Sequence, residues 1–165
     1  MKSARPVHAP MAQFPVVDDC LQVGGVPLTE LACRVGRTPF YAYDRKLISQ
    51  RVELLRQHLP SRVHLHYAIK ANPMPEVVRH LAGLVDGLDV ASAGELKVAL
   101  GAGMSAASIS FAGPGKTDMD LEQAVAAAIV VNLESEREME RLAAIGTRKG
   151  VRPRVAVRVN PDFEL

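Results

Sequence analysis

One lysine lies where an apolar, strand-like segment is about to end. In HLHYAIKANP, residues 64–73, Leu65, Tyr67 and Ile69 alternate with a second set of residues that ends at Lys70. Lysine is rarely fully buried unless it is paired, so this position needs a reason. In a partly desolvated pocket a lysine has a lowered pKa and can act as a base or form a Schiff base with an aldehyde. A structural lysine whose ammonium group reaches solvent is the alternative, and position alone favours neither.

Arg158 ends a similar segment near the C-terminus. In RVAVRVN, residues 154–160, the valines form one face and Arg158 belongs to the other. An arginine at a strand end suits a phosphate or carboxylate ligand, whereas the spacing alone slightly favours an internal salt bridge. Asp89, near the end of GLDVA, could be the partner in that bridge or could hold Lys70.

The elements that must position these residues alternate regularly after residue 44. Helical spacing follows Asp44, which we expect to cap a helix. Strands are expected at 63–69, 87–91, 108–112, 128–133 and 154–160, and helices between them at 75–83, 93–102, 117–127 and 135–147. Three of these helices begin with a capping-box pattern: Ser92 with Glu95, Thr117 with Asp120, and Ser135 with Glu138. Glu95 therefore has a sufficient structural role as a capping residue.

This alternation predicts an α/β protein with a parallel sheet. No G-x-G-x-x-G sequence follows a strand, which argues against a dinucleotide-binding unit. Polar residues instead gather at the C-terminal ends of several strands, where a (β/α)8 barrel builds its active site. They are Lys70, Asp89, Asn132, Arg158 and Asn160. The chain holds five of the eight strands, so we expect a partial TIM barrel.

The residues before the barrel segment differ from it in composition and in hydrophobic pattern. Residues 1–15 are polar and contain several prolines, and we expect them to be poorly ordered. Residues 16–43 contain short β-like pieces within FPVVDD, CLQVGG and TPFYAYD, with Gly24 and Gly25 as a turn. The barrel segment itself is expected to span residues 44–165.

Composition excludes several classes of function. The net charge of +2 and the 4% aromatic content do not suggest nucleic-acid binding. The longest apolar run, residues 124–131, is too short to span a membrane, and the N-terminus has no secretory pattern. Cys20 and Cys33 match no metal-ligand spacing, and we expect no metal site. These features predict a cytoplasmic globular protein with reduced thiols.

The loop FAGPGK, residues 111–116, lacks P-loop spacing and is interpreted as a simple turn.

Five stretches in succession resemble the fold type III pyridoxal-phosphate decarboxylases, which act on diaminopimelate, ornithine or arginine. They are YAIKANP (67–73), LDVASAGEL (88–96), ISFAGPGK (109–116), VNLES (131–135) and VAVRVNPD (155–162). The resemblance runs from about Pro15 to the last residue. The sequence of the N-terminal part further resembles the branch associated with exosortase A systems, which accompany exopolysaccharide gene clusters.

The resemblance implies roles for four residues. Lys70 matches the lysine that forms the Schiff base with pyridoxal 5'-phosphate, while Asp89, Glu95 and Arg158 match residues that line the cofactor site. The implied fold is the alanine-racemase-like barrel plus a β domain, to which residues 16–43 would contribute. The implied reaction is decarboxylation of an amino-acid substrate by a homodimer.

The family's later motifs have no counterpart in this sequence. These include the glycine-rich phosphate loop, the ring-stacking histidine and the acid that pairs with the pyridine nitrogen. We therefore expect the 165-residue chain to be the front part of a longer protein and to have little activity alone. An alanine-racemase-like enzyme and a non-catalytic pyridoxal-phosphate-binding protein are the alternatives. The racemase motif shares K-A-N, but Pro-Met-Pro follows here where a Tyr-Gly stretch is usual.

Overall fold

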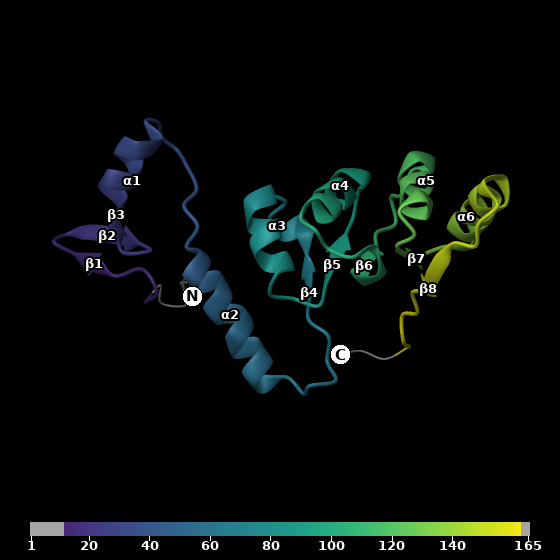
Figure 1. Cartoon of the computed structure of the whole chain (residues 1–165), viewed down its shortest axis with the longest axis horizontal. Coiled ribbons are helices and arrows are strands. Elements are labelled where there is room, and N and C mark those ends of the chain that lie inside the picture. Colours follow the sequence, from purple (N-terminus) through teal and green to yellow (C-terminus); the bar gives the residue numbers. More distant parts are fainter. Residues whose placement is uncertain (1–11, 163–165) are drawn as a thin grey trace, which may run out of the picture. The chain divides into compact units, whose positions relative to one another are not determined.

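The computed structural model describes residues 12–162 and divides the chain into two compact units (Figure 1). The first unit runs to Glu53 and the second begins at Leu54, so the division falls within helix α2, Arg45–His58. The expected disorder of residues 1–15 falls mostly on residues 1–11, which lie outside the described residues. None of the described helices is long and apolar enough to cross a membrane.

The first unit contains a small antiparallel sheet in the order β1-β2-β3. Its strands are Val16–Val17, Cys20–Val23 and Val26–Pro27. Gly24 and Gly25 connect β2 to β3 with φ angles of 61° and 79°, a left-handed conformation that glycine adopts without strain. The predicted turn is therefore confirmed.

Two features of the first unit differ from the prediction. Helix α1, Leu28–Val35, was not expected, although Leu28, Leu31 and Val35 have helical spacing. The segment TPFYAYD forms no strand, because its alternation of side chains finds no neighbouring strand to pair with. Alternation marks a strand only where a partner offers backbone hydrogen bonds.

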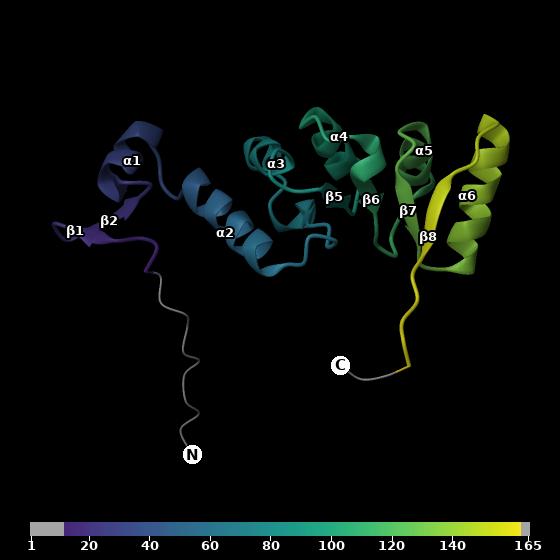
Figure 2. The same ribbon diagram turned by 60° about the horizontal axis from the view of Figure 1, so that its bottom comes forward.

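The second unit is a parallel sheet whose strands follow the chain order, β4-β5-β6-β7-β8. The strands are His66–Ala68, Gly87–Val90, Ile109–Phe111, Val130–Leu133 and Arg154–Val157. A doubly wound sheet reverses its strand order at a switch point, and this sheet does not. Consecutive order with helices along one face is the wall of a (β/α)8 barrel, as Figure 2 shows.

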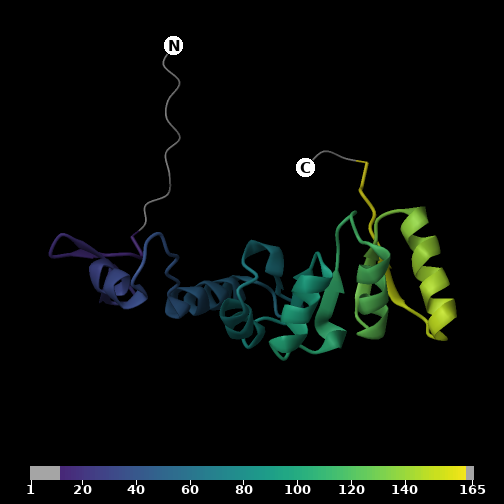
Figure 3. The same ribbon diagram turned by 90° about the horizontal axis from the view of Figure 1, so that it is seen from above.

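Four helices connect these strands and lie side by side along the sheet (Figure 3). They are α3 Pro75–Ala82, α4 Ala93–Gly101, α5 Asp118–Ala126 and α6 Glu136–Lys149, and two short 3-10 helices, η1 Ile69–Ala71 and η2 Ala106–Ser108, complete the unit. The core lies between sheet and helices. Its largest fully buried side chains include Ile69, Leu88, Ile109, Phe111, Leu121 and Leu142.

The three predicted helix caps are confirmed, with one refinement. The hydroxyls of Ser92, Thr117 and Ser135 each accept a hydrogen bond from the backbone N–H three residues later. Only Thr117 and Asp120 form the reciprocal capping box. The carboxylates of Glu95 and Glu138 instead accept from the N–H of the residue before the cap, Ala91 and Glu134 respectively.

The strand that leads to Lys70 is shorter than predicted at both ends. It begins at His66 because its partner, β5, begins at Gly87, which pairs with His66. Leu65 donates its N–H to the Asp86 carboxylate instead, at 2.6 Å. At the other end the chain turns into η1, so Lys70 lies in a 3-10 helix just beyond the strand.

Asp86 is the basis for a prediction about acid stability. Arg56 donates to its carboxylate at 2.6 Å, and this bond, with the Leu65 N–H, lowers the pKa of Asp86 from 3.8 to about 2. A lowered folded-state pKa stabilises the fold above pH 3.8, and this contribution is lost as the pH falls towards 2. Asp86→Asn should therefore lower the free energy of unfolding at neutral pH and flatten its acid dependence, as urea denaturation at several pH values would show. Asp118→Asn is the control, because it removes an ion pair with Arg141 in which the Asp118 side chain is 75% exposed. It should change neither the free energy of unfolding nor its acid dependence by much. Equal pH profiles for wild type and Asp86→Asn would contradict this.

Candidate functional site

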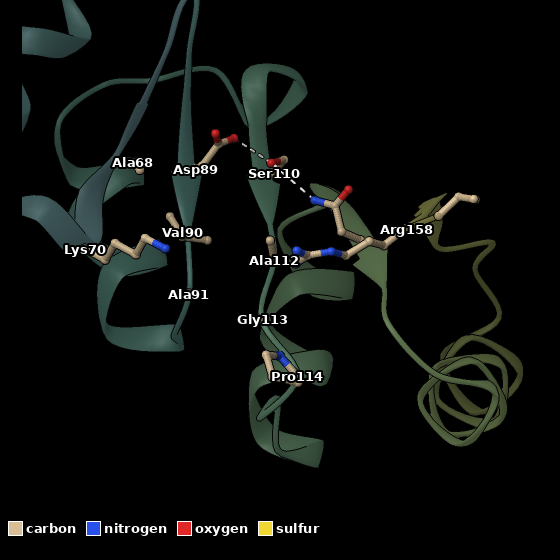
Figure 4. A pocket seen from close by; sticks show the side chains of 12 residues that line it. Ala68, Lys70, Asp89, Val90, Ala91, Ser110, Ala112, Gly113, Pro114 and Arg158 are labelled. Carbon is tan, nitrogen blue, oxygen red and sulfur yellow. Dashed lines mark hydrogen bonds between the residues drawn. The ribbon is translucent and has the colours of Figure 1, made fainter. Parts of the chain in front are cut away.

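A cavity of about 670 Å³ lies at the C-terminal ends of the parallel strands (Figure 4). Its size is typical of a small-molecule site. Every strand from β4 to β8 contributes, either directly or through the residues that follow it. The lining residues are Ala68, Lys70, Asp89, Val90, Ala91, Ser110, Ala112, Gly113, Pro114, Asn132, Arg158 and Val159.

Lys70 enters this cavity from the turn after β4. The turn is fixed below the lysine by Ile69, which is fully buried, and by hydrogen bonds from the Asn72 N–H to Ile69 O and from the Tyr67 hydroxyl to Asn72 O. The Lys70 side chain is exposed and forms no ion pair within residues 12–162. The described residues therefore leave the Lys70 side chain open to solvent and do not by themselves form a desolvated pocket around it.

The floor of the cavity carries a chain of hydrogen bonds across four strands. Asp89 Oδ1 accepts from Ser110 Oγ at 2.6 Å and lies 3.1 Å from His66 Nδ1. Asn132 Nδ2 in turn donates to Ser110 Oγ at 3.4 Å. Figure 4 shows this row running from Asp89 through Ser110 towards the end of β7. Asp89 is thus held by His66 and Ser110, and neither Lys70 nor Arg158 is its partner.

Gly87 permits this arrangement, which leads to a second prediction. A Cβ atom on Gly87 would lie 2.5 Å from His66 Cε1 and 2.5 Å from the Ser108 carbonyl oxygen. Gly87→Ala should therefore displace the His66 ring from Asp89 and destabilise the fold by about 1–3 kcal/mol, the usual effect of overpacking. Chemical denaturation and the NMR signals of His66 would measure both effects.

Gly101→Ala is the matched control, because a Cβ atom there meets nothing within 4 Å. It should leave both stability and the His66 signals near wild type. A Gly87→Ala protein as stable as Gly101→Ala, with unchanged His66 signals, would contradict the proposed close packing.

Arg158 reaches the cavity from the residue after β8. Its backbone N–H donates to Leu133 O at 3.0 Å, which fixes it beside the end of β7. Its guanidinium lies 3.5 Å from both carboxylate oxygens of Glu134. The hydrogen bond from the Gly113 N–H, together with the charge of Arg158, lowers the pKa of Glu134. Arg158 therefore lines the cavity and also has an ion-pair partner, Glu134, but the pair is not internal, because the Arg158 side chain is 57% exposed.

Lys70 and Arg158 approach the cavity from opposite sides. Figure 4 shows the two side chains extending towards each other over β5 and β6. An electrophilic carbonyl at the Lys70 end would match its amine, and an anionic group at the Arg158 end would match its guanidinium.

Two predicted site residues lie elsewhere. Glu95 is not among the lining residues, and its carboxylate caps the start of α4 through the Ala91 N–H at 2.8 Å, so its cofactor role stays a prediction. Asn160 is exposed and also does not line the cavity. In the part of the chain that the structure describes, no cluster of His, Cys, Asp or Glu could hold a metal ion.

Sequence reasoning missed three polar residues of this region. Ser110 and Glu134 were not singled out, and Lys116 was interpreted only as part of a turn. A signal existed for Ser110, which alternates with buried Ile109 and Phe111 and so points to the Asp89 face. Glu134 and Lys116 lie in loops, where no periodicity indicates the direction of a side chain.

Comparison with known proteins assigns the family. Residues 45–165 match the family "Pyridoxal-dependent decarboxylase, pyridoxal binding domain". The chain belongs to this family. The match implies pyridoxal 5'-phosphate as the cofactor and confirms the resemblance to the fold type III decarboxylases.

Individual relatives agree with this assignment. The chain is 40% identical over 148 residues to the diaminopimelate decarboxylase of Aquifex aeolicus and 38% identical over 156 residues to that of Pseudomonas aeruginosa. These matches cover 89% and 93% of the chain but 35% and 37% of the relatives. The chain thus spans about a third of the length of these pyridoxal-dependent decarboxylases.

Solved structures confirm the fold. Diaminopimelate decarboxylase from M. jannaschii superposes with a TM-score of 0.80 at 28% identity, covering 92% of this chain and 36% of that one. The Helicobacter pylori enzyme, solved with L-lysine, gives a TM-score of 0.74 at 34% identity, covering 81% and 34%. The predicted partial barrel of the alanine-racemase-like pyridoxal-phosphate fold is therefore confirmed.

The residues of the cavity fit pyridoxal phosphate. Its aldehyde requires a primary amine that is not tied up in an ion pair, and Lys70 meets this requirement. Its polar ring substituents and negative charge require hydrogen-bonding and cationic groups, which Asp89, Ser110, Asn132 and Arg158 supply along the cavity. These five residues are the ones that would hold the cofactor.

Proposed function

We propose that the full-length protein decarboxylates an amino acid with pyridoxal phosphate bound covalently at Lys70. The observation that carries this proposal is the position of Lys70, a primary amine without an ion pair in the described residues, at the barrel-rim cavity of a pyridoxal-dependent decarboxylase. In this proposal residues 44–165 form the front part of the barrel and residues 16–43 belong to a second β domain. The 165-residue chain alone should have little activity.

The chemistry divides between cofactor and protein. Bound pyridoxal phosphate supplies an electron-withdrawing ring that stabilises the electron pair left on the α-carbon when carbon dioxide departs. Lys70 would hold the cofactor through its side-chain amine. A Lys70 amino group that is free of the cofactor could also donate or accept a proton at the reacting carbon.

The remaining residues of the cavity would orient and hold the cofactor and the substrate. Asp89 presents a fixed carboxylate, since His66 and Ser110 hold Oδ1. Arg158 offers a guanidinium to an anionic group of cofactor or substrate, and Glu134 limits where that guanidinium can point. Asn132 adds an amide that is itself positioned by Ser110 Oγ and Phe111 O.

The proposed substrate class and subfamily are supported by the relatives and by the sequence of the N-terminal part. The relatives named above are diaminopimelate decarboxylases, so a diaminopimelate-, ornithine- or arginine-like amino acid is the proposed substrate class. Resemblance of the N-terminal part supports the exosortase-associated, exopolysaccharide-linked branch. We further propose a cytoplasmic homodimer for the full-length protein.

A substrate panel tests this function. Full-length protein with pyridoxal phosphate should release carbon dioxide from at least one of diaminopimelate, ornithine, lysine and arginine. Loss of optical activity without carbon dioxide would instead support the racemase alternative. Cofactor binding with neither reaction on any substrate would support a non-catalytic pyridoxal-phosphate-binding protein.

A further inference from the structure

Two charged side chains are buried within residues 12–162, and neither lines the cavity. Lys116 is 5% exposed and Glu138 is 3% exposed. Lys116 Nζ lies 3.0 and 3.1 Å from the two carboxylate oxygens of Glu138. Burying such a pair costs hydration free energy, and an apolar pair of similar volume often stabilises a fold as well or better. Stability alone is therefore a weak reason for this pair.

The pair is bonded to the two loops that follow β6 and β7. Lys116 Nζ also donates to Gly113 O at 2.7 Å and to Asn132 O at 2.9 Å. Glu138 Oε2 accepts from the Glu134 N–H at 3.0 Å. The ammonium group thus satisfies two backbone carbonyls and the carboxylate satisfies one backbone N–H.

These backbone groups belong to the wall of the cavity. Gly113 and Asn132 line it, and Glu134 is the ion-pair partner of Arg158, which also lines it. Gly113 is held at both of its polar atoms, because its N–H donates to Glu134 and its carbonyl accepts from Lys116. The lowered pKa of Glu134 agrees with a carboxylate that is held in its charged form.

We propose that Lys116 and Glu138 are positioning residues for this decarboxylase site. They fix the loops after β6 and β7 and, through Glu134, set the direction of the Arg158 guanidinium towards an anionic group in the cavity. The inference rests on the proposed function, because it assigns the pair to the cofactor site of that function. It adds a buried polar network beneath the residues that touch the cofactor.

The test uses the full-length protein and the double variant K116M/E138M. Removing both charges leaves no buried charge unpaired, so the variant should still fold. Its denaturation midpoint should fall, because the carbonyls of Gly113 and Asn132 and the N–H of Glu134 lose their partners. The dissociation constant for pyridoxal phosphate should rise by at least about tenfold, the usual effect of losing groups that orient a site. Without cofactor, amide hydrogen exchange should become faster at Gly113 and Glu134 while it stays unchanged in the core strands.

The matched control is E122M/R148M, which removes an exposed ion pair between α5, the helix that follows the Lys116 loop, and α6, the helix that carries Glu138. It should change neither cofactor affinity nor hydrogen exchange at the two loops. If K116M/E138M fails to fold, K116Q/E138Q carries the test, since it removes both charges together and keeps polar side chains for the backbone groups. K116Q/E138Q should shift affinity and exchange in the same direction, to a smaller extent.

A double-mutant cycle with R158M distinguishes an effect that acts through the direction of the Arg158 side chain from a general structural effect. Because the pair is proposed to act through Arg158, K116M/E138M should weaken cofactor binding much less in the R158M background than in wild type. Equal weakening in both backgrounds would overturn the inference, as would a folded variant with unchanged affinity and exchange. A wild-type protein that binds no pyridoxal phosphate would instead overturn the proposed function, while hydrogen exchange would still decide the loop-fixing role of the pair.

Discussion

Replacing Lys70 with alanine in the full-length protein is expected to abolish covalent attachment of pyridoxal phosphate and decarboxylase activity. The Lys70 amine has two proposed roles, which are to hold the cofactor and to transfer a proton, and the substitution removes both. Loss of the proton-transfer role alone typically lowers a rate by about 10²–10⁴-fold. The loss of activity should therefore be at least this large, measured as carbon dioxide released per enzyme at saturating cofactor.

Without cofactor, the stability of the Lys70→Ala protein should stay near that of the wild type. Lys70 is exposed and makes no ion pair with the described residues, so its removal leaves no buried cavity and no unpaired charge. Lys97→Ala is the matched control, because Lys97 is an exposed lysine on α4 outside the cavity. Lys97→Ala should retain full activity. A Lys70→Ala enzyme as active as Lys97→Ala would contradict the catalytic role of Lys70.

Phe111→Ala should have the largest effect on stability among truncations to alanine of the fully buried core side chains, because Phe111 is the largest of them. Phe111 is fully buried in β6, where its ring packs in the core and lies 5.8 Å from Lys116 Nζ. Truncation of a buried phenylalanine costs about 3–5 kcal/mol, because transfer free energy is lost and a cavity is left. Chemical denaturation should show this loss, and the expected consequence is little folded protein at elevated temperature.

Met119→Ala provides the comparison for that result. Met119 lies in α5 of the same βα unit and is 64% exposed. Its truncation should change the free energy of unfolding by no more than about 0.5 kcal/mol. If Phe111→Ala cost as little as Met119→Ala, the assignment of β6 to the core of the barrel wall would be wrong.

Local signals in the sequence predicted most of the barrel wall. Ser92, Thr117 and Ser135 each mark a helix start, and all three act as caps in the structure. The apolar runs between the caps gave the strands in the right order. These signals are reliable because caps and buried strands depend on neighbours within a few residues.

Features that depend on distant partners were predicted less well. The alternation in TPFYAYD resembles a strand but has no partner, and β4 is cut short where β5 begins. Helix α1 was overlooked although its apolar spacing is helical, because short β-like pieces flank it. For TPFYAYD and β4 the decision lies with strand pairing across the chain, which a single sequence does not display.

The candidate site shows the same division. The family motif identified Lys70, and strand ends identified Asp89, Asn132 and Arg158, since a parallel sheet brings its C-terminal ends to one edge. The Lys116–Glu138 pair joins residues that are 22 positions apart, one in a loop and one at a helix start. Only the fold reveals that both are buried together.

Chemical trapping of the cofactor would show whether Lys70 is the residue that binds pyridoxal phosphate covalently. Full-length protein is incubated with pyridoxal phosphate, reduced with sodium borohydride, digested and analysed by mass spectrometry. We expect one modified peptide that contains Lys70 and carries the reduced pyridoxyl group on its amine, with no such peptide from Lys70→Ala. A label on another lysine, or an unlabelled Lys70 in protein that binds the cofactor, would contradict this expectation.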